Sequence, residues 1–137
     1  VQLETGTTAT DFENLQYGQQ LALCQRYYEK SYNYDTLPGA VGVYNNFVVS
    51  GGNRGGVTTL HIVDTVYFVV TKRAIPTFTT WDISGNIGKL SRDNFGASST
   101  ANIASILTGT GENRVTVYSV GASAHSNSFH YVAEAEL

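Results

Sequence analysis

Three histidines, one cysteine and eleven acidic residues are the side chains of this sequence that could carry metal, nucleophilic or acid–base chemistry. His61, His125 and His130 do not stand in HxH, HExxH or another spacing of metal ligands. The sequence therefore predicts no metal site and no cofactor. His61 interrupts an apolar run, and we expect it to be a hydrogen-bonded residue of the core or of a sheet face.

Enzymatic chemistry has little support in the residue pattern. A GxSxG motif is absent, and Cys24 has no partner at a recognisable spacing. Asp64, Asp82 and Asp93 lie near expected strand ends and could supply the carboxylate pair of a glycosidase, but any β protein offers such pairs. The GGNRGG segment lies between two expected strands, which is the wrong context for a phosphate-binding loop. We predict that the chain is not an enzyme.

Aromatic and polar side chains in expected loops and at strand ends are better candidates for a functional site. An aromatic ring can cover the C–H face of a pyranose, while amides and carboxylates hydrogen-bond its hydroxyls. The predicted ligand-binding residues are Tyr44, Asn46, Asn53, Arg54, Trp81 and Asp82. The alternative is structural: Trp81 would belong to the core, and the glycine-rich segment 51–56 would be only a turn.

The charge and composition exclude several partners. The net charge of −3 argues against nucleic acid, and the largest basic cluster is the pair Lys72-Arg73. No apolar run approaches the roughly 18 residues of a membrane span. Charged residues make up 14% of the chain, against about 25% in typical proteins, and 14 glycines accompany many hydroxyl and amide side chains. This composition is typical of strands joined by tight turns on stable extracellular or virion surfaces.

The segment 17–30 (YGQQLALCQRYYEK) is the one place where apolar residues recur at helical spacing. Tyr17, Leu21, Cys24 and Tyr28 form one stripe, and a second flank carries Leu23 and Tyr27. The pattern predicts a helix over 17–30 that packs on its own domain and on a neighbour. Its packing residues would be Leu21, Leu23, Cys24, Tyr27 and Tyr28, with Cys24 a buried, inert thiol.

The rest of the chain reads as strands and turns. We expect a strand at 41–50, with a bulge or turn at Asn45-Asn46, and two strands, or one strand bent at Asp64-Thr65, at 57–72. Further strands are expected at 77–82 and 87–92, with 93–100 a loop. A hairpin around Gly109 and Gly111 and a half-buried terminal strand complete the set, which predicts an all-β fold: a jelly-roll-like β-sandwich with one short N-terminal α-helix.

Residues 1–16 are expected to be the end of an upstream module or a linker strand, and 17–137 the helix with its β domain. The alternating VQLE start predicts a short strand that cannot be stable alone. The chain contains no Met, so we expect the natural polypeptide to begin upstream of Val1.

Four segments together resemble the C-terminal region of bacteriophage tail fibres and related virion fibre proteins. They are VQLE-x-G-x-x-AT-x-F, YGQQLALCQRYYEK, RAIPTFT-x-WD-x-x-GN-x-GK and the terminal FHY-x-A-x-AEL. The resemblance covers most of the chain. Residues 35–70 resemble the family only in the general character of their residues, so no loop or ligand residue is inferred from it there. Gln20 stands where Glu is more usual, which puts one salt bridge in doubt.

The resemblance implies the distal receptor-binding domain of a virion fibre, a homotrimer that attaches to a host cell-surface glycan or protein and acts outside the cell. It implies no catalytic residue. The alternatives are a stand-alone carbohydrate-binding module of a secreted enzyme, a polysaccharide depolymerase fragment, and a trimerisation cap without ligand.

Overall fold

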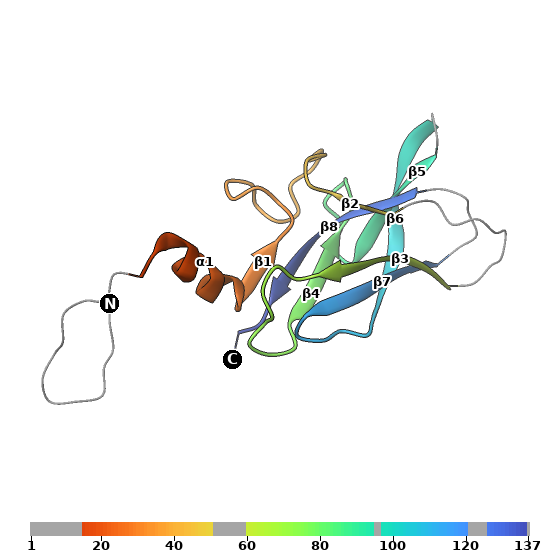
Figure 1. The fold of residues 1–137 in the computed structure, drawn as a ribbon. Helices are drawn as coiled ribbons and strands as arrows, with labels where there is room; N and C mark the ends of the chain where they lie inside the picture. Colours follow the sequence, from red (N-terminus) through yellow and green to blue (C-terminus); the bar gives the residue numbers. More distant parts are fainter. Residues whose placement is uncertain (1–14, 51–59, 95–96, 121–125, 137) are drawn as a thin grey trace, which may run out of the picture.

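The computed structural model of the protein describes residues 15–50, 60–94, 97–120 and 126–136 (Figure 1). These ranges contain one helix, α1 (Tyr17–Gln25), and eight strands. The strands are β1 (Tyr28–Lys30), β2 (Val48–Ser50), β3 (Leu60–Tyr67), β4 (Thr77–Trp81), β5 (Lys89–Asn94), β6 (Ala97–Thr108), β7 (Arg114–Val120) and β8 (Ser126–Glu134).

The C-terminal strand β8 organises the sheet. Its C-terminal half pairs with both β1 and β4, and its N-terminal half pairs with β2 and β5. The order β1-β8-β5-β6-β7-β3 is antiparallel throughout, and the long strand β6 passes from β5 to β7. The sheet curls, so the two faces of the expected sandwich belong to one sheet. The all-β class with one short helix is confirmed.

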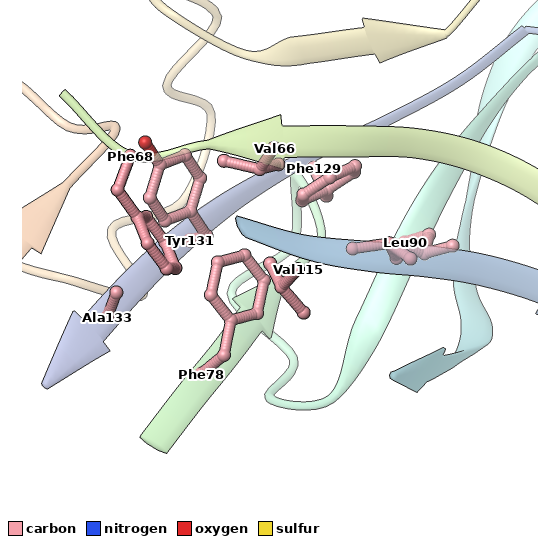
Figure 2. Close-up of a cluster of buried hydrophobic side chains, with 9 residues drawn as sticks. Val66, Phe68, Phe78, Leu90, Val115, Phe129, Tyr131 and Ala133 are labelled. Carbon is pink, nitrogen blue, oxygen red and sulfur yellow. The ribbon is translucent and has the colours of Figure 1, made fainter. Parts of the chain in front are cut away.

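The core lies between β8, β4 and β5 on one side and β3 and β7 on the other (Figure 2). Alternate residues of a strand face the same side, and β8 contributes Phe129, Tyr131 and Ala133. Phe78 of β4 stacks on Tyr131, with the ring centroids 5.0 Å apart. Burying one such aromatic ring contributes roughly 1.5–3 kcal/mol. The other members are Val66, Phe68, Leu90, Val115 and Val117.

A buried polar network joins β1 to this core. Glu29 Oε2 accepts a hydrogen bond from Lys72 Nζ at 2.6 Å, and Glu29 Oε1 accepts one from the Tyr131 hydroxyl at 2.9 Å. Lys72 Nζ also donates to Gln25 O at 2.6 Å, and the backbone N–H of Val69 donates to Glu29. Every polar group of the pair therefore has a partner, as a buried charge requires. Burial, and next the Glu29 carboxylate, raise the pKa of Tyr131 well above its usual range.

The predicted helix 17–30 is wrong in its last turn. The helix ends at Gln25, and Tyr28–Lys30 form β1 in register with Val132–Glu134. These residues form a strand because pairing with β8 satisfies their backbone hydrogen-bonding groups and places Glu29 beside Lys72. The helix, in contrast, has no buried residue. Cys24 is exposed, so the expected buried thiol is also wrong for this chain. In Figure 1, α1 projects from the β1 end of the sheet.

The expected half-buried terminal strand is confirmed at Glu134 and Glu136, which are exposed, but it is wrong at His130 and Val132, where β8 is buried on both faces. His130 and Val132, on the predicted polar side, are 1% and 3% exposed. The loop formed by residues 31–47, which we call the capping loop, covers this face. The alternation of apolar residues in β8 predicted its core face correctly. Burial of the other face by a loop could not be predicted, because such a loop does not change the alternation in the strand that it covers.

Several local expectations are confirmed. The β6–β7 hairpin surrounds Gly109, and β3 shifts register between Ile62 and Asp64.

The expected loop at 93–100 is wrong, because β5 continues to Asn94 and β6 begins at Ala97. The expected strand 41–50 shrinks to Val48–Ser50, because Gly42 and Asn46 adopt positive φ. His61 lies on β3 opposite Ser119, while His125 and the expected strand at 1–4 lie outside the described residues.

Candidate functional site

The capping loop connects β1 to β2 and is built from short turns. Thr36 N–H donates to Asn33 O, and Ala40 N–H donates to Leu37 O. Gly39 adopts a φ of +80°, and Tyr32 O–H accepts the Gly39 N–H at 3.1 Å. These bonds fix the loop over β8 without regular secondary structure.

His130 of β8 anchors the capping loop between two aromatic rings. Its ring centroid lies 3.9 Å from that of Tyr32 and 4.1 Å from that of Phe47. Nε2 donates to Val43 O at 3.2 Å, so the Ser31 hydroxyl donates to Nδ1 at 2.9 Å. Both ring nitrogens of the neutral imidazole are thus satisfied. Burial lowers the pKa of His130, although the bond to Val43 partly opposes this.

A first cleft, the strand-side cleft, opens where the capping loop meets β2, β5 and β8. Its volume is about 270 Å³. The loop contributes Tyr44, Asn46 and Phe47, and the strands contribute Val49, Ser91, Ser126 and Ser128, with Ile83 after β4 completing the lining. Tyr44 is 70% exposed, and its ring meets Phe47 edge-on at 6.3 Å. This cleft offers an aromatic surface beside a row of hydroxyl groups.

A second cleft, the helix-side cleft, lies between α1, β1 and the capping loop and has a volume of about 330 Å³. Tyr28, Lys30, Tyr34 and Asn46 are among its lining residues. Tyr28 and Lys30 face it because the side chain between them, Glu29, points to the core side of β1. Burial, and next the charge of Glu134, raise the pKa of Tyr28.

The structure brings together only part of the predicted ligand-binding set. Tyr44 and Asn46 lie at the strand-side cleft, whereas Asn53 and Arg54 lie outside the described residues. Trp81 is half-buried beneath the capping loop and meets Tyr32 edge-on at 6.3 Å.

Asp82 is fully buried and holds the turn that follows β4. Its Oδ1 accepts the backbone N–H groups of Ser84 and Asn86, both at 2.9 Å, and its Oδ2 accepts the Asn86 side-chain amide. Its carboxylate therefore has a structural role in this turn.

Phe47, Tyr34 and the serines of β5 and β8 were missed as site residues. The sequence contained one indication, the density of tyrosines between positions 27 and 44. That density does not show which rings would pack and which would stay exposed, since the fold of the loop decides it.

The expected packing residues of the helix segment divide in two. Leu21, Leu23 and Cys24 lie on α1, whereas Tyr27 and Tyr28 lie beyond its end. Leu23 is 47% exposed and Tyr17 is 75% exposed, so α1 presents apolar side chains to solvent.

Within the described residues, no group of three or more His, Cys, Asp or Glu side chains is placed to hold a metal ion. No helix in the same ranges is long and apolar enough to cross a bilayer. Comparison of the chain with protein-family models, with curated proteins and with solved structures gives no match.

Proposed function

We propose that this domain is the receptor-binding tip of a virion fibre and that it binds a host cell-surface glycan through the strand-side cleft. The observation that carries the proposal is the exposed ring of Tyr44, which lines a cleft together with serine, asparagine and apolar side chains. A protein receptor on the host surface is the second class of ligand that such a tip would bind.

The chemistry of the cleft suits a sugar. The ring of Tyr44 can cover the apolar face of a pyranose, and the Ser126 and Ser128 hydroxyls can exchange hydrogen bonds with its hydroxyls. His130 holds Phe47, and Phe47 contacts Tyr44, so the aromatic surface is ordered before the ligand arrives. A surface that is ordered in advance loses less entropy on binding.

The exposed apolar side chains of α1 support a homotrimer. Tyr17 and Leu23 are 75% and 47% exposed, and an exposed apolar helix face is typical of an interaction surface. Three copies would turn weak single-site binding into firm attachment, because the second and third contacts become intramolecular. The domain would act outside the cell, as part of the virion.

Two measurements test this proposal. A glycan array probed with the domain tests for the ligand, and light scattering at micromolar concentration measures the mass. A trimer that binds a defined glycan supports a fibre tip. A monomer that binds one is a carbohydrate-binding module, and a trimer that binds no glycan is a tip for a protein receptor or a structural cap, so either result contradicts glycan binding by a trimeric tip.

A further inference from the structure

Asn46 lies at both clefts, so the strand-side and helix-side clefts meet at this side chain. Asn46 has a φ of +62° and donates from Nδ2 to Asn33 Oδ1 at 2.7 Å, which fixes its position. In the described part of the chain, this bond uses one of its two amide N–H donors. The other N–H and the carbonyl oxygen stay available to a ligand.

The helix-side cleft repeats the chemistry of the strand-side cleft. Tyr34 is 82% exposed and Tyr28 is 40% exposed, and both rings line the cleft together with the amide of Asn33. Exposed rings beside amide groups are the same combination that Tyr44 and Asn46 form on the other side. A ligand that fits one cleft is therefore chemically suited to the other.

A cation distinguishes the two clefts. Lys30 Nζ donates to Tyr34 O at 3.1 Å and to Thr36 O at 2.9 Å, which leaves one of its three N–H donors. Within residues 15–50, 60–94, 97–120 and 126–136, no carboxylate lies within 4.0 Å of this ammonium. Glu29, its sequence neighbour, also lines the cleft, but its carboxylate is paired with the Lys72 ammonium. The helix-side cleft thus holds a positive charge that a ligand can neutralise.

We propose that the two clefts form one groove for an acidic oligosaccharide, with a sugar carboxylate placed at Lys30. This inference rests on the proposed carbohydrate binding and extends it. The strand-side cleft takes one sugar against Tyr44, the chain crosses Asn46, and an acidic sugar lies against Tyr34 and Lys30. A charged acceptor at Lys30 makes the hydrogen bond stronger than a neutral hydroxyl would.

The test uses a glycan array in which each neutral oligosaccharide has a counterpart that carries sialic or glucuronic acid. The array selects an acidic hit and its neutral counterpart, and calorimetry with both then compares the wild-type domain with the variants Lys30→Gln, Tyr34→Ala and Tyr44→Ala. Tyr67→Ala is the matched control, because Tyr67 of β3 is 65% exposed and lines neither cleft. Unfolding midpoints of all variants show that each is folded.

We expect Lys30→Gln to weaken binding of the acidic hit about tenfold and to leave binding of its neutral counterpart unchanged. We expect Tyr34→Ala to weaken the acidic hit by a similar factor, with no effect of Tyr67→Ala. If Lys30→Gln weakens both glycans equally, the lysine only supports the loop, and the assignment of an acidic sugar is wrong.

The outcomes also separate this inference from the proposal on which it rests. If only Tyr44→Ala loses binding, and Lys30→Gln and Tyr34→Ala bind like the wild type, the proposed acidic-sugar site in the helix-side cleft is wrong. Carbohydrate binding at the strand-side cleft then still holds. An array without any hit contradicts both the acidic-sugar site and carbohydrate binding at the strand-side cleft.

Discussion

The Glu29 carboxylate and the Lys72 ammonium form a buried ion pair of 2.6 Å, in which the Lys72 side chain is 0% exposed. The pair joins β1 to the segment after β3, two parts of the chain that the sheet order places at opposite ends. Because the Tyr131 hydroxyl and the Gln25 carbonyl complete it, removal of one partner leaves several groups unsatisfied.

We predict that Lys72→Met lowers the free energy of unfolding by about 3–5 kcal/mol, because Glu29 is left as a buried charge without its counterion. Urea denaturation measures this loss. Lys89→Met, at a half-exposed position of β5, is the control and should change stability by less than about 0.5 kcal/mol. Equal midpoints for the two variants would contradict the structural role of the pair.

Gly85 lies against the capping loop, and we predict that Gly85→Ala is destabilising. Its φ is +78°, and an added Cβ would lie 2.5 Å from Gly39 O. The left-handed conformation alone costs an alanine roughly 1–2 kcal/mol, and the displaced Gly39 adds to this. Trp81, which lies against Gly39, is the one tryptophan and reports the displacement by its fluorescence.

The matched control for this variant is Gly18→Ala on α1. Among the described residues, an added Cβ at Gly18 meets no atom within 4 Å, and alanine is the better helix former. Gly18→Ala should keep or slightly raise stability with unchanged Trp81 fluorescence. The prediction fails if the two variants behave alike.

The burial of His130 predicts a loss of stability on acidification. Because burial lowers its pKa in the folded state, the unfolded chain binds more protons below about pH 6.5. The contribution is therefore complete above about pH 6.5 and is lost as the pH falls through the folded pKa. We expect His130→Gln, which keeps a neutral side chain at every pH, to flatten the dependence of unfolding free energy on pH in this range.

The difference between the wild-type and His130→Gln curves isolates this histidine, because all other titrating groups are common to both. Parallel curves below about pH 6.5 would show that His130 does not titrate with unfolding.

Cys24 provides a probe of the proposed trimer. It is the one cysteine and is exposed in the single chain, so a thiol reagent should label it readily in dilute solution. If α1 packs between subunits, labelling slows as the protein concentration rises and the trimer forms. Leu23→Lys adds a charge to an exposed helix position and should abolish this protection without unfolding the domain. A labelling rate independent of concentration would contradict packing through the helix.

Local patterns in the sequence predicted much of the sheet. The turn residues around Gly109 indicated the β6–β7 hairpin, and alternation placed Phe129 and Tyr131 on the core face of β8. Patterns failed where distant segments decide the outcome. Tyr28–Lys30 have helix-compatible residues, but pairing with β8 makes them a strand.

The candidate site could be predicted only in part for the same reason. Tyr44 and Asn46 were predicted and lie at the strand-side cleft, but the proposed role of Lys30 depends on the pairing of Glu29 with Lys72. The polar character of Asp82 suggested a ligand contact, whereas its oxygens accept bonds from the turn that follows it.

The most direct test of the account is the affinity of the array-selected glycan for Tyr44→Ala, measured by calorimetry beside the wild-type domain and Tyr67→Ala. Removal of a central aromatic contact should weaken binding at least about tenfold, or about 1.4 kcal/mol, while Tyr67→Ala binds like the wild type. Equal affinities for all three proteins would contradict carbohydrate binding at the strand-side cleft.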